Sequence, residues 1–210
     1  MDGAEMSAAG RGAIRVEHDF YATPAWCIEA IAGRIHWADV HVAGEPARGD
    51  GAVIKALEPW YRGQWRCHEI REGWDYLKSE PYPVDLVITN PPYNLAFDFL
   101  KTSLRDARCV VYLLRINFLG SAKRREFLQA NRPTHLYTLS ERPSFVDVCA
   151  GIKEPVKRKG CGSAFHKDAR IKICPDCGGR VKAGTDATEY AWICWDRGNI
   201  MRDAPGMYFL

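Results

Sequence analysis

The residues with the clearest chemical meaning are Asn90-Pro91-Pro92-Tyr93, which directly follow an apolar segment at residues 85–89. Two prolines end strand pairing, so this tetrapeptide is expected to form a loop at the carboxyl end of a strand. The Asn90 side-chain oxygen and the Pro91 carbonyl are two acceptors on a stiff backbone, which suit the two hydrogens of an amino group. Tyr93 adds a flat face for stacking. The pattern predicts a site for an exocyclic amine on a planar ring, the alternative being a Pro-rich turn without a ligand.

A second set of residues, upstream, has the composition of a cofactor loop. Gly49 and Gly51, within residues 45–51, allow positive φ and close backbone approach. The loop leads into a predicted helix, whose amino end favours a carboxylate. Glu69 follows the next predicted strand, in a position to take ribose hydroxyls, and Asp75 is placed to take an adenine amino group. The alternative for each acid, taken singly, is a solvated surface charge.

Four potential metal ligands occur further along, in the pattern Cys-x4-His-x7-Cys-x2-Cys: Cys161, His166, Cys174 and Cys177. A closed set of four such ligands is typical of structural zinc. The surrounding segment has few apolar residues, so it needs such a staple to hold a shape. Cys149 is the substitute ligand if His166 is not used, and reduced side chains in a loop without metal are the alternative. The remaining cysteines lie in apolar patterns and are predicted to be buried small hydrophobes: Cys27, Cys67, Cys109 and Cys194.

The charge distribution separates this cysteine segment from the rest of the chain. The 210 residues carry 29 Lys+Arg and 26 Asp+Glu, a net charge of +3. Residues 151–184 alone hold nine basic and three acidic residues, so their net charge is +6 and the remainder is −3. A basic, zinc-folded segment would suit phosphate contacts, for which the candidates are Lys157, Arg158, Lys159, Lys167, Arg170 and Lys172. A structural brace or a protein-contact surface is the alternative.

The elements that must position these groups alternate between strand and helix. Thr23 is predicted to cap a first helix that begins at Pro24. Further helices are expected near residues 95–104 and 122–130. Apolar runs predict strands that include residues 40–43, 65–70, 85–89, 109–116, 135–139 and, as the last, 190–195. This alternation predicts an α/β, Rossmann-like fold: a mostly parallel sheet with helices on both faces and ligands beyond its carboxyl strand ends.

The same patterns suggest a division of the chain. Residues 1–15 are small and polar and are expected to form a flexible terminus. Residues 16–150 and 185–210 are expected to form the main domain. Residues 151–184 have no long helical or strand pattern and are expected to form a small basic, zinc-stapled insertion, a candidate for target recognition.

These residues together resemble S-adenosylmethionine-dependent methyltransferases of the amino-methylating class, and most closely the small phage and prophage DNA adenine-N6 methyltransferases. Residues 19–24 resemble that family's motif at the methionine end of the cofactor, residues 45–51 its Gly-rich loop and residues 90–93 its catalytic loop. Segments 113–128, 140–145 and 190–192 also match. The resemblance covers roughly residues 17–148 and 185–198. Arg48 departs from the small residue expected in the Gly-rich loop.

The resemblance implies a class I methyltransferase fold and a role for each matching residue. The cofactor would be held by Asp19, Tyr21, Thr23, Glu45, Pro46, Gly49, Gly51, Glu69, Asp75 and Asn90. The target base would be turned out of its stack, stacked on Tyr93 and gripped by Asn90 and Pro91. These acceptors would free the nitrogen lone pair for attack on the methyl-sulfonium, with positioning supplying most of the catalysis. Phe145 is a second candidate stacking face, or else a core aromatic.

The resulting expectation is a DNA adenine-N6 methyltransferase with a structural Zn²⁺. No apolar stretch long enough to cross a membrane and no secretory signal are visible in the sequence. We therefore expect the protein in the cytoplasm of a bacterium or phage-infected cell, where a disulfide framework is not expected. One alternative is an enzyme of the same fold that acts on cytosine N4, RNA or a protein amide. Another, of a different class, is a non-catalytic zinc-bearing nucleic-acid-binding protein.

Overall fold

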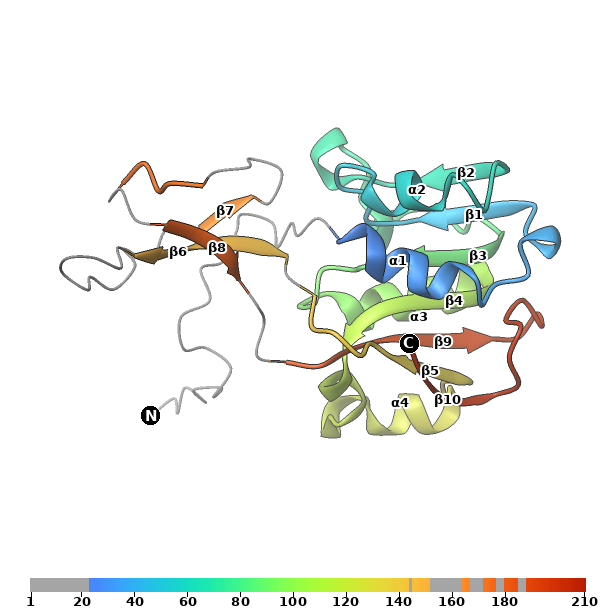
Figure 1. The fold of residues 1–210 in the computed structure, drawn as a ribbon. Helices are drawn as coiled ribbons and strands as arrows, with labels where there is room; N and C mark the ends of the chain where they lie inside the picture. Colours follow the sequence, from blue (N-terminus) through green and yellow to red (C-terminus); the bar gives the residue numbers. More distant parts are fainter. Residues whose placement is uncertain (1–22, 144, 152–163, 167–171, 177–179, 185–187) are drawn as a thin grey trace, which may run out of the picture. The chain divides into compact units, whose positions relative to one another are not determined.

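The computed structural model describes residues 23–143, 145–151, 164–166, 172–176, 180–184 and 188–210 (Figure 1). The chain divides into two compact units. The large unit comprises Ala22–Pro143 and Thr185–Leu210, and the small unit comprises Met1–Tyr21 and Ser144–Gly184. Among the helices of the described residues, none is long and apolar enough to cross a membrane.

A seven-stranded sheet forms the centre of the large unit. Its strands are β1 (Val42–Glu45), β2 (Gln64–Cys67), β3 (Val84–Thr89), β4 (Ala107–Arg115), β5 (His135–Thr138), β9 (Tyr190–Asp196) and β10 (Gly206–Phe209). They follow the order β10-β5-β9-β4-β3-β1-β2, which can be read upward in Figure 1. Four of the six neighbouring pairs are parallel, and β9 runs antiparallel between β4 and β5. The predicted mostly parallel, Rossmann-like sheet is confirmed.

The prediction that residues 190–195 form the last strand is wrong, because β10 follows them. β10 pairs with β5 and lies at the edge of the sheet. Its side chains are mostly exposed, so it lacks the continuous burial that marks the central strands. The preceding Pro205 and Gly206 are also typical of a turn.

In the described residues, four α-helices accompany the sheet: α1 (Ala25–Ala32), α2 (Ala52–Leu57), α3 (Ala96–Asp106) and α4 (Arg125–Ala130). Short 3-10 helices lie at Trp37–Asp39, Ile70–Glu72, Tyr76–Lys78, Ile116–Leu119 and Ala122–Arg124. The prediction that Thr23 caps the first helix is wrong. Pro24 is the capping residue and no side chain caps this helix. The Thr23 hydroxyl is instead hydrogen-bonded within the site described below.

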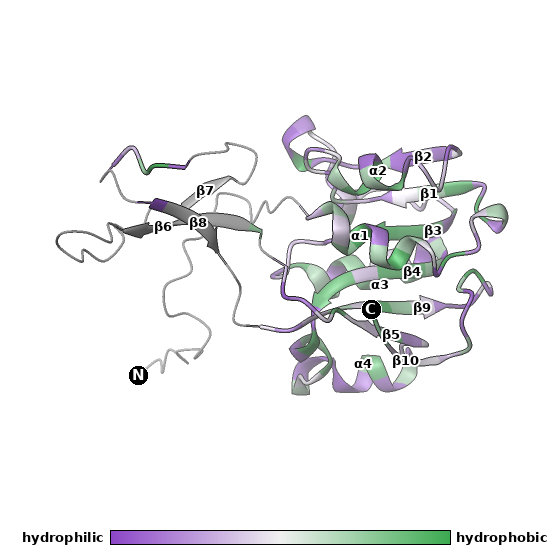
Figure 2. Ribbon diagram, in the orientation of Figure 1, coloured by the Kyte–Doolittle hydropathy of each residue, from purple (hydrophilic) through white to green (hydrophobic). Residues whose placement is uncertain are grey.

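Helices cover both faces of the sheet because the side chains of its central strands alternate. Val110, Tyr112 and Leu114 of β4 pack in one apolar cluster with residues of α3. On the opposite face, Trp192 of β9 donates a 2.7 Å hydrogen bond from Nε1 to the Cys27 carbonyl of α1. Figure 2 shows the hydrophobic residues concentrated on β3, β4 and β9, whereas β2 is more hydrophilic.

Three of the four cysteines predicted to be core residues are buried: Cys27, Cys109 and Cys194. Cys67 is only half-buried. The reason is its position in β2, which lies at the edge of the sheet and alternates between exposed and half-buried side chains.

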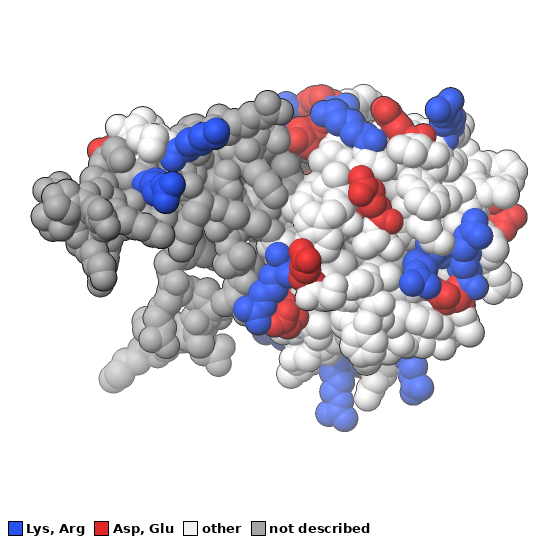
Figure 3. All heavy atoms as spheres, viewed as in Figure 1, with Lys and Arg blue, Asp and Glu red and all other residues white. Residues whose placement is uncertain are grey.

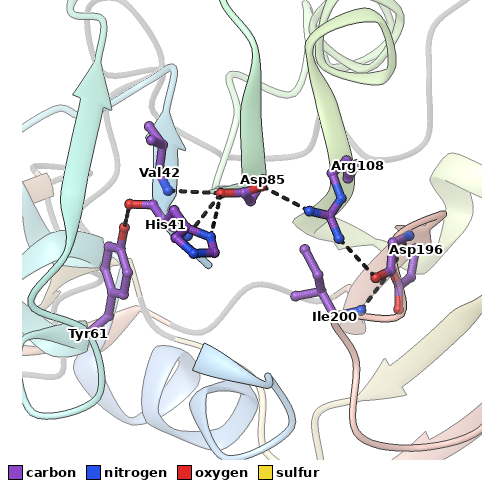
Figure 4. Close-up of polar contacts among 8 residues, drawn as sticks. His41, Val42, Tyr61, Asp85, Arg108, Asp196 and Ile200 are labelled. Atoms are coloured by element: carbon purple, nitrogen blue, oxygen red, sulfur yellow. Dashed lines mark hydrogen bonds and ion pairs between the residues drawn. The ribbon is translucent and has the colours of Figure 1, made fainter. Parts of the chain in front are cut away.

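The amino ends of the central strands are joined by a closed polar network, which we call the amino edge (Figure 4). Asp85 of β3 accepts hydrogen bonds from the backbone of His41 and Val42, at 2.9 and 3.0 Å, and from Arg108 of β4, at 3.1 Å. Asp196 accepts three backbone hydrogen bonds, from Gly198, Ile200 and Met201. Each of these carboxylates therefore has a protein partner on both oxygens.

The small unit contains a second, antiparallel sheet. Its strands are β6 (Val146–Gly151), β7 (Ala164–His166) and β8 (Arg180–Gly184), in the order β7-β6-β8. These short strands were not predicted. The segment contains Lys, Arg and Gly in place of apolar alternation, and the pairing partners are far apart in the sequence.

Candidate active site

The sheet has a topological switch point between β1 and β3. From β1 the chain moves to β2 on one side and then returns to β3 on the other side. In open α/β sheets, ligands bind outside the carboxyl ends of the strands at such a point. The register pairs Gly44 with Val87, so Glu45 at the end of β1 lies close to Thr89 at the end of β3. The structure thus brings together loops 45–51 and 90–93, at what we call the carboxyl edge.

In the loop after β3, Asn90 is held by a contact that the sequence did not indicate. Its Nδ2 donates a 3.0 Å hydrogen bond to Oγ1 of Thr23, which is itself buried. Asn90 Oδ1 is buried and accepts no hydrogen bond of ordinary geometry from the described residues, although the neighbouring Tyr93 hydroxyl interacts with the Asn90 side chain closely enough for it to lower the pKa of Tyr93. Thr23 therefore occupies the donor end of the amide and leaves the oxygen as an acceptor, as recognition of an amine requires.

Tyr93 lies in an aromatic and cationic cluster. The guanidinium of Arg115, the last residue of β4, lies over its ring at 5.1 Å, and the Tyr190 ring of β9 is 5.8 Å away. Arg115 Nε also donates a 3.0 Å hydrogen bond to Tyr190 Oη. Burial, followed by Tyr190, raises the pKa of the Tyr93 hydroxyl well above its usual value, so this hydroxyl stays neutral. Sequence reasoning did not assign Arg115 a role, although an arginine that ends an apolar strand at the carboxyl edge was the available signal.

The Gly-rich loop has the conformation that its glycines predict. Gly49 and Gly51 have φ of 56° and 80°, in the left-handed region that favours glycine. Arg48, the residue that departs from the family pattern, donates its backbone N–H to the His68 carbonyl at 3.1 Å and pairs through its guanidinium with Glu72. It therefore braces the loop against the segment that follows β2.

Glu45 is a fully buried acid at the end of β1. Its Oε1 accepts the Ala47 N–H at 3.1 Å, and its Oε2 has no hydrogen bond of ordinary geometry within the described part of the chain. Burial raises its pKa to about 8; the Thr89 hydroxyl and the Ala47 N–H oppose this rise and Glu69 adds to it. A cation placed beside Glu45 would lower this pKa.

The two acids predicted to contact ribose and adenine already have protein partners. Glu69 accepts the Gly49 N–H at 2.7 Å and two hydrogen bonds from Arg71. Burial raises the pKa of Glu69, but the hydrogen bonds from Arg71 and Gly49 together lower it by more than burial raises it. The net shift of this pKa is therefore downward. Asp75 accepts the Leu77 N–H and pairs with Lys78, both at 3.1 Å. A carboxylate has about four lone-pair sites, so each acid keeps some capacity for a ligand.

Buried polar atoms without a hydrogen-bond partner are concentrated at the carboxyl edge. Seven such side-chain atoms occur in the described residues. Six of them belong to the ends of β1, β2 and β3 or to the loops that follow: Glu45 Oε2, Arg48 Nε, His68 Nδ1, Thr89 Oγ1, Asn90 Oδ1 and Tyr93 Oη. The seventh is Tyr82 Oη, which precedes β3. Four of these atoms belong to two neighbouring pairs, since the Thr89 side chain lowers the pKa of Glu45 and the Asn90 side chain lowers that of Tyr93. Buried polar atoms whose hydrogen bonding is incomplete mark this edge as the candidate site for a polar ligand.

Several predicted residues lie outside the described part of the chain: Asp19, Tyr21, Lys157, Arg158, Lys159, Cys161, Lys167, Arg170 and Cys177. Pro46, Pro91 and Pro92 are described and lie in the two loops of the carboxyl edge, where Pro46 and Pro91 are buried. In the small unit, Phe145 and Cys174 are buried and Lys172 is exposed. A search of the described residues finds no group of three or more His, Cys, Asp or Glu that could hold a metal ion.

The backbone register of the small unit separates two of the predicted zinc ligands. His166 pairs with Val146, at the start of β6. Arg180 pairs with Gly151, at the other end of β6, and forms an isolated bridge with Ile173. Ile173 immediately precedes Cys174, so the Cys174 and His166 backbones are assigned to opposite ends of a strand about 17 Å long.

Comparisons with known proteins identify no family. Neither the protein-family models nor the curated proteins contain a match to this chain. Among solved structures, it is similar to the 23S rRNA methyltransferase ErmE, with 13% identity, coverage of 88% of this chain and 73% of that chain, and a TM-score of 0.46. A dimethyladenosine transferase from Plasmodium falciparum is 9% identical, with coverage of 87% of this chain and 63% of that chain, and a TM-score of 0.47. Precorrin-6y C5,15-methyltransferase from Geobacter metallireducens is 13% identical, with coverage of 86% of this chain and 97% of that chain, and a TM-score of 0.45. These likenesses are too distant to indicate a substrate.

Proposed function

We propose that this chain is an S-adenosylmethionine-dependent methyltransferase that modifies the exocyclic amino group of a flipped-out base in DNA, namely N6 of adenine. The observation that carries the proposal is the concentration of unpartnered buried polar atoms at the switch point of the sheet. Three of these atoms belong to Thr89, Asn90 and Tyr93, in or next to the Asn-Pro-Pro-Tyr loop, whose amide nitrogen is hydrogen-bonded to Thr23. An acceptor site beside a cofactor-type loop suits the transfer of a methyl group to an exocyclic amine, because the acceptors hold the amino hydrogens.

The residues of the carboxyl edge fit this cofactor. Glu45 and Glu69 are acids of the kind that would accept hydrogen bonds from ammonium and hydroxyl groups. Glu45 Oε2 is buried and accepts no hydrogen bond of ordinary geometry from the described residues. Gly49 and Gly51 have the φ values that allow close approach of a ligand to the backbone. S-adenosylmethionine supplies an activated methyl group when bound. Asp19 and Tyr21 complete the proposed set from the preceding segment.

The protein's own hydrogen-bond acceptors would position the target base. Asn90 Oδ1 and the Pro91 carbonyl would accept the two amino hydrogens of the target base and hold its lone pair toward the reacting carbon. Thr23 fixes the amide so that its oxygen, and not its NH₂, faces the base. Tyr93 would stack on the base from a ring that Arg115 holds in place. Phe145 is the proposed second stacking face for the target base.

The test is to incubate the protein with labelled S-adenosylmethionine and DNA, RNA or protein, and to identify the product by mass spectrometry. We expect N6-methyladenine in DNA. Asn90→Ala should bind the cofactor nearly as wild type and transfer no methyl group, whereas Asn94→Ala, an exposed neighbour, should keep full activity. N4-methylcytosine, modified RNA or a modified protein amide would keep the reaction class and replace the substrate. Persistent methylation by Asn90→Ala would overturn the site.

We also propose that the small unit binds one structural Zn²⁺ through Cys161, Cys174 and Cys177. The fourth ligand is His166 or Cys149, and the register of β6 supports Cys149, because His166 pairs at the strand end remote from Cys174. A reducing cytoplasm would keep these thiols available to the metal. Metal analysis should find one zinc per chain in wild type and in His166→Ala, and a loss of zinc in Cys149→Ser. The reverse pattern would make His166 the ligand, and zinc-free wild type would overturn the site.

The basic segment 151–184 is proposed to contact the phosphates of the target. Its net charge of +6 supports this role, together with the exposure of Lys172 and Arg180. Removal of residues 153–182 should reduce the dependence of DNA affinity on salt concentration. An unchanged salt slope would contradict phosphate contact by this segment.

A further inference from the structure

The large unit carries a groove that the active site does not use. It has a volume of about 480 Å³ and lies between the turn after β4 and helix α4. Leu119 and Leu128 contribute to its apolar part, and Arg125 and Arg132 add charge. Segment 119–132 contains four Lys and Arg residues and one acid, Glu126, so its net charge is +3.

The basic residues of this segment divide into two kinds. Arg124 has a structural role, because its Nε donates a 2.8 Å hydrogen bond to the Phe118 carbonyl and its guanidinium lies 4.4 Å from the Phe118 ring. Lys123, Arg125 and Arg132 are exposed, and no described carboxylate lies within ion-pair distance of them. In Figure 3, basic side chains project from the lower edge of the large unit, where α4 lies in Figure 1, with no acidic side chain beside them in that view. Charge without partners is what an anionic ligand needs.

The groove is connected to the proposed active site through the protein's own packing. Its first lining residue, Leu119, ends the 3-10 helix that follows Arg115, whose guanidinium lies over Tyr93. Phe127 of α4 packs edge-on against Phe97 in the first turn of α3, with ring centres 5.2 Å apart, and α3 begins three residues after Tyr93. Packed side chains of the same unit thus connect the groove to the loop that carries Tyr93.

We infer that this groove binds the sugar–phosphate backbone of the nucleic acid whose base enters the active site, an inference that rests on the proposed function. A nucleic-acid backbone alternates charged phosphates with less polar sugars. The groove offers the complementary pattern, arginines together with apolar side chains and small residues that permit close approach. Arg125 and Arg132 contact phosphates, and the apolar part of the groove receives the sugar edges.

The test measures DNA affinity against salt concentration for the double variant Arg125→Gln/Arg132→Gln of the full chain, with a fluorescent duplex. Loss of two phosphate contacts should reduce the slope of log K against log salt by about 1.8. The matched control is Arg62→Gln/Arg66→Gln, which removes the same charge from exposed residues without described ion pairs at the β2 edge. This control should keep the wild-type slope.

The outcomes separate the groove from the proposed function. If wild type binds and methylates DNA but the groove variant keeps the wild-type slope, the groove inference is wrong and the function stands. An equal loss in the control would also overturn it, since the effect would then be one of net charge. If wild type neither binds nor methylates nucleic acid but binds polyglutamate through Arg125 and Arg132, the groove serves an acidic protein and both proposals fail.

Discussion

The two edges of the large sheet differ in how completely their polar side chains are hydrogen-bonded. At the amino edge, Asp85 and Asp196 accept hydrogen bonds on both oxygens, mostly from the backbone, and Arg108 links β4 to Asp85 and to the Gly198 carbonyl. At the carboxyl edge, Glu45 and Asn90 each keep a buried oxygen that accepts no hydrogen bond of ordinary geometry from the described residues. The strands are the same, so strand geometry does not cause this difference.

The contrast supports the proposal that the amino edge contributes stability and the carboxyl edge binds a ligand. A satisfied carboxylate lowers the free energy of the folded chain, whereas an unpartnered buried oxygen costs about 1–3 kcal/mol until something binds it. The carboxyl edge therefore carries a cost that a ligand with donor groups would remove. Substitutions at the two edges should separate stability from activity.

The largest expected effect on stability is at the amino edge. Asp196→Ala removes the acceptor of three backbone N–H groups and should lower the free energy of unfolding by roughly 2–4 kcal/mol. Thermal denaturation measures this loss. Below the melting transition, the variant should still bind cofactor as wild type does. A stable Asp196→Ala protein that has lost cofactor binding would reverse the assignment of the two edges.

At the carboxyl edge, Glu45→Gln should stabilise the chain in a pH-dependent way. The pKa of Glu45 is about 8 in the folded chain and 4.5 for a carboxyl group exposed in the unfolded chain. The native state therefore holds the proton more tightly, and wild-type stability falls as pH rises from 4.5 to 8. Glutamine does not titrate, so the variant does not lose stability in this way as pH rises. Thermal denaturation should therefore give similar melting temperatures at pH 4 and a higher one for the variant at pH 8, by roughly 2–4 °C per kcal/mol.

The same variant tests the ligand role of Glu45. Cofactor product, S-adenosylhomocysteine, should raise the melting temperature of wild type more than that of Glu45→Gln. Equal ligand shifts in the two proteins would show that Glu45 does not contact the cofactor, and a wild-type chain with no fall in stability between pH 4.5 and 8 would contradict its burial as an acid.

Thr23→Val should reduce turnover with little effect on folding. The substitution keeps the shape and removes the acceptor of the Asn90 Nδ2 hydrogen bond. One such bond corresponds to about 0.5–1.5 kcal/mol, so kcat should fall roughly 2- to 10-fold while KM for the cofactor changes little. Thr23→Ser, which keeps the hydroxyl, should restore most of the rate. If the serine variant is as slow as the valine variant, Thr23 acts through packing and not through Asn90.

Arg115→Lys should have the smallest effect. Lysine keeps the charge but loses the planar guanidinium that lies over Tyr93 and donates to Tyr190. A cation–π contact of about 0.5–1 kcal/mol predicts a loss of roughly 2- to 5-fold in kcat. Steady-state kinetics would show this loss without a change in melting temperature above about 2 °C. A large fall in stability would assign Arg115 a structural role only.

The sequence allowed prediction of the features that depend on local pattern. The apolar run 85–89, its Pro-Pro end and the glycines at 49 and 51 indicated a strand, its loop and positive φ, and the structure has all three. The contacts that connect these loops were beyond such reasoning. Thr23 and Asn90 are 67 residues apart, and nothing local distinguishes a helix-capping threonine from one that bonds a distant amide. β10 was missed for the same reason, since an exposed edge strand has no burial pattern.

The central claim is that the carboxyl edge performs amino-group methylation, and it is tested most directly by nucleoside mass spectrometry on DNA incubated with S-adenosylmethionine and either wild type or Asn90→Ala. The account predicts N6-methyladenine from wild type and none from the variant, although both bind the cofactor. Wild-type protein that binds S-adenosylmethionine but leaves DNA, RNA and protein unmodified, or an Asn90→Ala variant that methylates at the wild-type rate, would contradict it.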